Sequence, residues 1–261
     1  MMTDPIPLSK LARAALWMAL ICGALALISG VGNRFGWWPF DTALMLLGGA
    51  FIGAVIAMVL AMVGLVVIRL GGKRRGAALS IAALLIAIPL VLLPLWHAQR
   101  AGALPAIHDI STDTLDPPVF VALLPVREAS PNGSAYGGEA VATLQRAAYP
   151  GITTLLLVEP PDQVFAQVRG VVRSLGWEEA AADLAEGRVE AVATTFWFGF
   201  KDDVVIRLRP QGNGARLDIR SASRVGRSDL GANAARIREF MMLLTQRTPA
   251  VEEEHQSSAQ D

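Results

Sequence analysis

The chain has 261 residues, 53% of them hydrophobic, and its mean hydropathy is +0.43. A chain this apolar is typical of a membrane protein rather than of an ordinary soluble domain. Lysine plus arginine and aspartate plus glutamate both number 23, so the charge balance argues against a nucleic-acid-binding protein. The acidic residues are unevenly placed, because only Asp4 and Asp41 precede Trp96.

Three apolar runs occupy much of the first 96 residues, at 11–29, 43–68 and 77–96. Each provides about the 20 residues that a helix needs to cross the hydrocarbon core of a bilayer. Because two more spans follow the first run, we interpret that run as a membrane helix rather than a cleaved signal peptide. Pro89 and Pro94 predict kinks in the third helix. No charged residue interrupts the second or third run, which favours an anchor over a transporter.

Basic residues predict the orientation of these helices. Lys10 and Arg13 precede the first run, whereas Arg34 alone lies between the first and second. The loop between the second and third runs contains Arg69, Lys73, Arg74 and Arg75. Basic loops stay in the cytoplasm, so we expect a cytoplasmic N-terminus. An odd number of spans then makes this a multi-pass protein of a bacterial inner membrane, with its C-terminal domain in the periplasm.

Small residues in the second run predict close contact between helices. Gly49 and Gly53 have the spacing that lets two membrane helices approach each other. Cys22, the only cysteine, lies in the first run, so no disulfide can form within one chain.

The residues after Trp96 predict one folded domain at 97–247, followed by a polar, disordered tail at 248–261. Residues 108–118 are expected to be extended, and Ser130–Gly138 to form a flexible loop. The remaining pattern predicts strands at 153–158, 177–182 and 189–196, helices at 160–176 and 229–246, and a hairpin that turns at 211–214. The fold class is therefore α+β: three transmembrane helices, then an antiparallel sheet with two helices packed on one face.

The hairpin has two possible registers. A turn centred on Gly212-Asn213 places Asp218 opposite Arg207, and a turn centred on Asn213-Gly214 places it opposite Arg209. Either pair contributes roughly 0.2–1 kcal/mol.

Three arginines precede the last predicted helix, in the sequence RSASRVGRSDLG: Arg220, Arg224 and Arg227. Ser228 or Asp229 is suited to cap that helix. Arg224 and Arg227 are expected to pair with Asp229, Asp109 or Asp113, or else to bind an anion such as a lipid headgroup. A nucleotide is not expected, because the Gly-Lys-Ser/Thr sequence of a phosphate-binding loop is absent.

The sequence TTFWFGFKDD is a second candidate site. Adjacent carboxylates on a strand point to opposite faces, so Asp202 and Asp203 cannot act together unless the backbone turns there. Trp197 and Phe198 belong to a group of aromatic residues too large for one face of a strand. They are interpreted as core packing, as the rim of a ligand cleft, or as a contact with the bilayer surface.

The histidines indicate little chemistry. His108 precedes Asp109, and this pair is interpreted as a hydrogen-bonded lead-in or as a proton-handling pair. The aspartates at 109, 113 and 116 lack the spacing of a calcium loop, and no histidines have metal-ligand spacing. No metal site and no cofactor are predicted.

Four segments resemble the DUF1499 family: HDISTDTLDPP, YPGI, EAVATTFWFGFKDDVVIRLRP and RLDIRSASRVGRSDLGANAARIREF. The resemblance covers about residues 108–240 and implies a shared fold, but it implies no activity. The polar and aromatic positions of these segments are the candidate site residues, forming either a ligand site or a structural polar network: His108, Asp109, Asp113, Trp197, Phe198, Asp202, Asp203, Arg220, Arg224, Arg227, Asp229 and Asn233. We expect the 108–118 lead-in to lie against the last strand–helix junction, held there by the arginines.

The sequence favours a membrane-anchored binding protein over an enzyme, with no catalytic residue identified. Its periplasmic domain is expected to bind a membrane-protein partner or an amphiphilic or anionic envelope ligand such as a lipid headgroup, and not nucleic acid. One alternative is an envelope enzyme that uses Asp, His and Arg residues at the strand–helix junction, which requires two titratable groups within about 3 Å of a common point. Another is a structural subunit of a membrane complex. A binding domain is expected to have a groove lined by Trp197 and Phe198.

Overall fold

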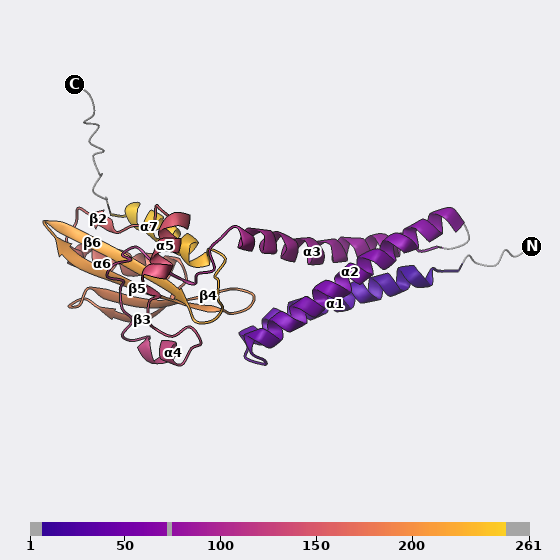
Figure 1. Ribbon diagram of the computed structural model, residues 1–261, viewed down its shortest axis with the longest axis horizontal. Coiled ribbons are helices and arrows are strands. Elements are labelled where there is room, and N and C mark those ends of the chain that lie inside the picture. The colour runs from indigo at the N-terminus through magenta and orange to yellow at the C-terminus, as the bar shows by residue number, and fades with distance from the viewer. Residues whose placement is uncertain (1–6, 72–74, 249–261) are drawn as a thin grey trace, which may run out of the picture. The chain divides into compact units, whose positions relative to one another are not determined.

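The computed structural model describes residues 7–71 and 75–248. These residues form two compact units (Figure 1). The first contains the chain up to Gly102 together with Phe196–Gly199, and the second contains Ala103–Thr195 and the chain from Phe200 onward. Lys73 and Arg74 of the predicted basic loop, and the predicted tail from residue 249, lie outside the described residues.

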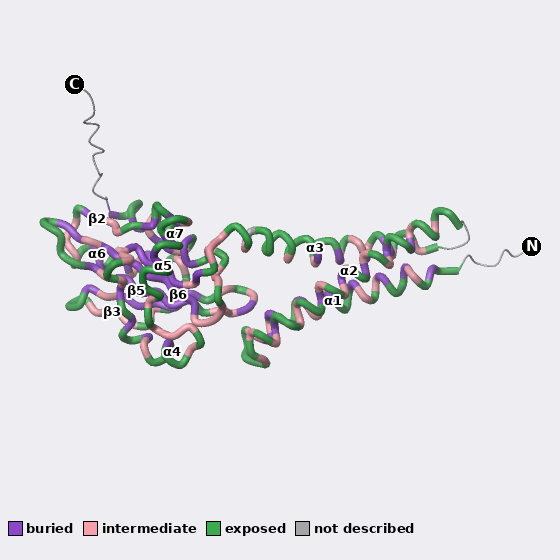
Figure 2. The backbone as a smooth tube through the Cα atoms, viewed as in Figure 1, coloured by how far each residue is buried: buried purple, intermediate pink, exposed green. Residues whose placement is uncertain are grey.

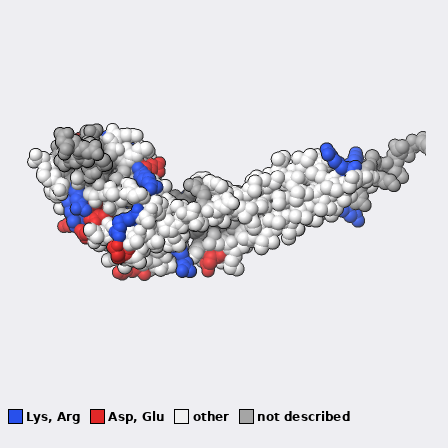
Figure 3. All heavy atoms as spheres, turned by 45° about the horizontal axis from the view of Figure 1, so that its top comes forward, with Lys and Arg blue, Asp and Glu red and all other residues white. Residues whose placement is uncertain are grey.

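Three helices make up most of the first unit: α1 (Lys10–Arg34), α2 (Phe40–Gly71) and α3 (Ala77–Gly102). By length and composition each is able to cross a membrane. They include the three predicted spans and extend beyond them by several residues. Helix α3 continues through both Pro89 and Pro94. In Figure 3, uncharged side chains cover most of the visible flank of this helical unit.

The helices of the first unit pack through small side chains. Fully buried alanines line the contacts, whereas the large side chains of Met45 and Leu85 are exposed. Buried and exposed residues alternate along these helices (Figure 2). A Cβ atom added at Gly53 would lie 2.4 Å from the Cys22 sulfur, so this glycine lets α1 and α2 approach closely. Gly49 has no neighbour within 4 Å of such an atom. The predicted small-residue contact is therefore present at Gly53 and not at Gly49.

The second unit is built on one antiparallel sheet. Its strands are β1 (Asp109–Ser111), β2 (Leu155–Leu157), β3 (Glu178–Asp183), β4 (Arg188–Thr194), β5 (Lys201–Gln211) and β6 (Gly214–Ser223). The order is β1-β6-β5-β4-β3, and β2 also pairs with β6. Gln211 pairs with Gly214, which centres the hairpin turn on Gly212-Asn213 and places Arg207 opposite Asp218. This is the first of the two predicted registers.

Two helices cover one face of this sheet, as predicted: α6 (Pro161–Ser174) and α7 (Ala232–Thr245). Their apolar side chains, including Val168, Ile237 and Phe240, meet the strands in a fully buried core. The fold class α+β is therefore confirmed. Two further helices, α4 (Leu124–Glu128) and α5 (Gly138–Ala148), were not predicted from the sequence. The segment expected to be a loop ends where α5 begins.

Candidate functional site

Asp202 and Asp203 point to opposite faces of the sheet, as strand alternation predicts. Asp202 forms a 2.6 Å ion pair with Arg236 of α7. Asp203, which is fully buried, forms ion pairs with Arg127 of α4 at 3.0 Å and with Arg224 at 2.7 Å. The two carboxylates are therefore separated by the sheet and cannot act together as an acid and a base.

Arg220 ties the lead-in to strand β6. Its Nε and Nη2 atoms donate to the two carboxylate oxygens of Asp109, at 2.9 and 2.7 Å. The same guanidinium also donates to the carbonyl oxygens of Pro118 and Ser134. Both members of the pair are almost completely buried. The lead-in is thus held to the last strand by an arginine, in the place where the sequence predicted it.

Aromatic rings fill the space between these buried cations. The Phe120 ring lies 4.7 Å from the guanidinium carbon of Arg127 and 5.0 Å from that of Arg220. Tyr136 lies against Arg220 on another side. Burial, together with the negative charge of Asp109, raises the pKa of Tyr136 to about 12. A region this enclosed is a polar core rather than a binding surface.

The arginine pairs differ from those predicted. Arg224 pairs with Asp203 rather than with Asp229, Asp109 or Asp113. The reason is the register, which brings the end of β6 beside the start of β5. Arg227 is exposed and forms no ion pair with the residues that the structure describes, so its predicted pairing is wrong.

Asp229 caps α7, one of the two capping residues predicted. Its carboxylate accepts hydrogen bonds from the backbone N–H groups of Gly231 and Asn233, both at 2.8 Å. Burial of this carboxylate raises its pKa, and the two backbone hydrogen bonds oppose that change. The helix itself begins at Ala232, three residues later than predicted, because Leu230 and Gly231 both have positive φ.

His108 and Asn233 join the lead-in to the same helix. The His108 carbonyl oxygen accepts from the backbone N–H of Ser223 and from the Asn233 side-chain amide. Asn233 Oδ1 accepts from the hydroxyl of Ser221. Both Asp109 oxygens accept from Arg220, and the buried His108 Nδ1 has no hydrogen-bond partner among the described residues, so the predicted proton-handling pair is not formed.

Trp197 and Phe198 lie in the turn between β4 and β5, where their rings meet edge to face at 4.9 Å. The preceding Phe196 is 91% exposed, so not all of these aromatics pack in a core. Neither Trp197 nor Phe198 lines the hollows at the sheet edge or the hollow of the helical unit.

Asp113 belongs to a second cluster of charges, at the sheet edge. Its Oδ2 atom accepts from Arg207 at 3.3 Å and from Arg216 at 2.6 Å. Arg207 and Arg216 also donate to Asp218, which is fully buried. The cross-strand pair predicted between Asp218 and Arg207 is therefore one part of a larger network.

A crevice opens at this edge, where two segments that are distant in sequence meet β6. Strand β1 pairs with residues 220–222 of β6, and β2 pairs with residues 215–217. Thr112 follows β1 and bonds to Ile219, and Thr154 precedes β2 and donates to Asp218 at 2.6 Å. Thr112 and Thr154 both line a concave surface at this edge.

Two adjoining hollows form this crevice and share Thr112 and Thr153. The first is lined by Thr112, Thr153, Thr154, Leu156, Gln211 and Arg216. The second is lined by Thr112, Thr114, Arg146, Tyr149, Pro150, Ile152 and Thr153. No carboxylate lines either hollow, and Asp113 and Asp218 accept hydrogen bonds from Arg216. The crevice therefore presents hydroxyl, amide and guanidinium groups to solvent.

Several residues of these clusters were not predicted from the sequence, among them Arg127, Arg216 and Arg236. Arg127 lies on the unpredicted helix α4, and Glu190 is a fully buried carboxylate on β4. Glu190 accepts from the backbone N–H groups of residues 121–123 and pairs with Arg188 at 3.2 Å. An acidic residue inside the apolar sequence VEAVA was the available signal for such a buried partner.

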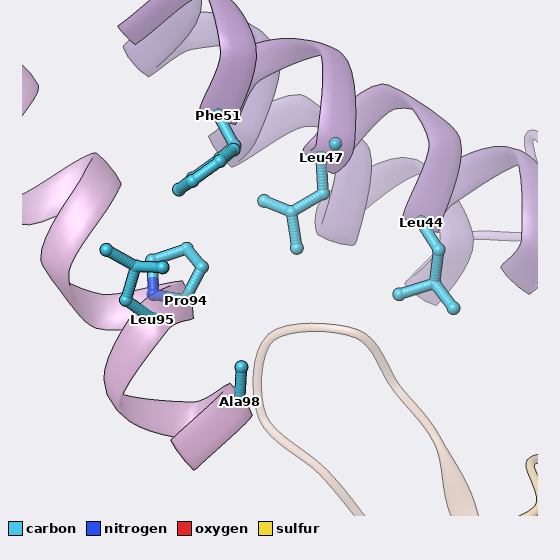
Figure 4. A pocket seen from close by; sticks show the side chains of 7 residues that line it. Leu44, Leu47, Phe51, Pro94, Leu95 and Ala98 are labelled. Atoms are coloured by element: carbon cyan, nitrogen blue, oxygen red, sulfur yellow. The ribbon is translucent and has the colours of Figure 1, made fainter. Parts of the chain in front are cut away.

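The helical unit has a hollow of a different kind. Leu44, Leu47 and Phe51 of α2 face Pro94, Leu95 and Ala98 of α3 across it, and Gly48 completes the lining (Figure 4). Ligand sites combine apolar walls with a few convergent polar groups. This hollow has no polar side chain, so it offers nothing that would select a ligand. Among the residues that the structure describes, no group of three or more His, Cys, Asp and Glu is placed to hold a metal ion.

Three helices able to span a membrane, followed by an α+β unit with a buried network of ion pairs, define a protein with a possible membrane anchor. The family model described as a protein of unknown function (DUF1499) matches residues 109–244, just over half of the chain. The chain therefore belongs to the DUF1499 family, as the four sequence segments indicated. No curated protein matches the chain.

Proposed function

We propose that this protein is a membrane-anchored binding protein whose C-terminal unit takes up an anionic, amphiphilic ligand of the cell envelope. The anchor is a multi-pass segment of a bacterial inner membrane. Its N-terminus is cytoplasmic and the C-terminal unit is periplasmic. The basic residues support this orientation, because Lys10 and Arg13 lie in the first turn of α1, Arg69 lies in the last turn of α2, and Arg75 precedes α3.

Binding is favoured over catalysis because the candidate carboxylates are engaged within the fold, whereas arginines and hydroxyl groups line the crevice. The candidate carboxylates are all engaged: Asp109, Asp113, Asp202 and Asp203 by arginines, and Asp229 by backbone amides. An acid or base must exchange a proton with a substrate at a cleft. The crevice at the sheet edge is instead lined by arginines and hydroxyl groups, which favour binding of an anion.

The proposal is tested with the full-length protein in nanodiscs of phosphatidylcholine, a zwitterionic lipid. Thermal unfolding is measured after addition of dihexanoyl phosphatidylglycerol or, as the neutral control, dihexanoyl phosphatidylcholine. A ligand at 100 times its Kd stabilises a protein by about 2.7 kcal/mol. For a unit of this size, that free energy raises Tm by about 5–10 °C.

The anionic lipid is expected to raise Tm and the zwitterionic lipid to leave it unchanged. A high-salt repeat separates a specific site from diffuse surface charge, because salt screens exposed charges much more than partly buried ones. Equal melting curves with the two lipids would refute an anion-selective site.

A further inference from the structure

The crevice at the sheet edge is suited to one chemical group, and this argument rests on the binding function proposed above. We infer that the crevice binds a phosphoryl group, recognised by Arg146 and Arg216 with Thr153 between them. Both arginines line the crevice and both are partly exposed, by 47% and 34% of their side chains. Thr153 lines both hollows, the one that contains Arg216 and the one that contains Arg146, so the two hollows adjoin at this residue.

Hydrogen-bond donors remain available at this surface. Arg216 uses Nε and Nη2 for Asp218, Asp113 and Thr154, but its Nη1 group bonds to none of the described residues. Arg146 uses its two Nη groups for Glu139, Thr114 and Thr143, which leaves Nε. The exposed Thr153 hydroxyl likewise makes no hydrogen bond within the described part of the chain.

Two carboxylates, Asp113 and Asp218, hold Arg216 and do not line the crevice, whereas Arg146 pairs with the exposed Glu139. Asp218, at 0% side-chain exposure, accepts from Arg216 Nε at 3.1 Å, and Asp113 accepts from its Nη2 at 2.6 Å. The guanidinium is therefore held along its Nε–Nη2 edge, so little side-chain entropy is lost on binding. Arg216 lines the crevice and the two carboxylates do not, so a bound anion would contact the arginine rather than Asp113 or Asp218.

The geometry of the donors favours a phosphoryl group over a carboxylate. A carboxylate offers two oxygens in one plane, which a single guanidinium fork satisfies. A phosphoryl group offers acceptor oxygens in several directions, as needed to bridge two guanidinium groups and a hydroxyl that come from different segments. Gln211 adds an amide at the rim of the first hollow. A free phosphate ester and a phospholipid headgroup share this chemistry.

The test uses the full chain in phosphatidylcholine nanodiscs and measures Kd by isothermal titration calorimetry. Glycerol 3-phosphate is the free phosphate ester, and dihexanoyl phosphatidic acid is the lipid headgroup. The variants are Arg146→Gln and Thr153→Val. Arg169→Gln is the matched control, because the Arg169 side chain is 41% exposed and also pairs with one carboxylate, Glu179, away from the crevice. Arg216 is not altered, since it also holds Asp113 and Asp218.

The wild type and Arg169→Gln are expected to bind equally well, and Arg146→Gln to bind about tenfold more weakly, since one charge-assisted hydrogen bond contributes that much. Thr153→Val is expected to weaken binding by a smaller factor. Binding of both probes identifies the phosphate ester as sufficient, and binding of the lipid probe alone identifies a headgroup site. Unchanged Tm values without probe exclude misfolding of the variants.

Two outcomes overturn the inference. If Arg146→Gln and Thr153→Val bind like the wild type, the phosphoryl site lies elsewhere, while an anionic lipid that still raises Tm leaves the binding function standing. If the wild type binds neither probe, the phosphoryl assignment is wrong. If phosphatidylglycerol also fails to change its Tm, the binding function is wrong as well.

Discussion

Replacing Arg220 with methionine tests whether the buried Arg220–Asp109 ion pair stabilises the fold. Methionine has nearly the volume of the arginine stem, so the change removes the charge while limiting the cavity. Asp109 is then left without its cation, at a residue exposure of 3%. The carbonyl oxygens of Pro118 and Ser134 lose their donor at the same time.

Breaking one partner out of a buried ion pair costs about 3–5 kcal/mol, because the remaining charge stays buried without compensation. At about 2–4 °C per kcal/mol for a unit of this size, Tm is expected to fall by roughly 6–20 °C. Differential scanning calorimetry of the full chain in nanodiscs measures this change without removing the helical unit.

Arg227→Met is the matched control, because Arg227 is exposed and unpaired among the described residues. Its Tm is expected to stay within about 2 °C of the wild type, since surface changes away from such pairs cost at most about 0.5 kcal/mol. The double variant Arg220→Met with Asp109→Leu removes both charges and is expected to be more stable than Arg220→Met alone. The reasoning fails if Arg220→Met melts like Arg227→Met.

Two further predictions address the turns and the membrane topology. Gly187 and Gly212 both have positive φ, but a Cβ atom at Gly187 would lie 2.4 Å from the Leu208 carbonyl oxygen, whereas Gly212 has open space. Gly212→Ala is expected to lower the free energy of unfolding by about 1–2 kcal/mol from backbone strain alone. Gly187→Ala is expected to lower it distinctly more in the same denaturant titration. Equal losses would show that the backbone at Leu208 moves away without cost. For topology, alkaline phosphatase fused after Arg247 is expected to be active in cells, and the same reporter fused after Arg75 inactive, since it folds only outside the cytoplasm; the reverse pattern would refute the proposed orientation.

Local sequence patterns predicted the β5–β6 hairpin well because its signals are local. Alternation fixed the faces of Asp202 and Asp203, and the Gly212-Asn213 turn set the register that brings Arg207 to Asp218. Helix α5 was not predicted, because a glycine-rich segment precedes it and its buried face is partly polar. Gln145 is buried there, and its side-chain amide exchanges hydrogen bonds with both backbone groups of Ser111. Hydrophobic periodicity does not detect a buried glutamine whose side chain forms the backbone hydrogen bonds that a neighbouring strand would otherwise form.

The crevice could not be predicted from the same patterns. Thr112 and Thr153 are 41 positions apart, and each is unremarkable in its own segment. They come together because β1 and β2 pair with successive parts of β6, which is a property of the topology. The arginines of the motif were visible in the sequence, but their partners depended on register. Arg224 directly follows β6, where its backbone N–H still bonds to Lys201 of β5, so its side chain meets Asp203. Arg227 lies four residues beyond the end of β6.

The charge clusters around Arg220 and Arg216 differ in whether their hydrogen-bond donors remain available. This difference distinguishes a cluster that stabilises the fold from one that could bind a ligand. Around Arg220, the donors are used within the fold and the carboxylate is sealed, so the charges hold the lead-in to the sheet. Around Arg216, the carboxylates hold one side of the guanidinium while its Nη1 group bonds to no described residue. An anion at that position would add a partner without displacing Asp113 or Asp218. For that reason we place the proposed ligand at the sheet edge, where its binding would leave the ion pairs of Arg216 intact.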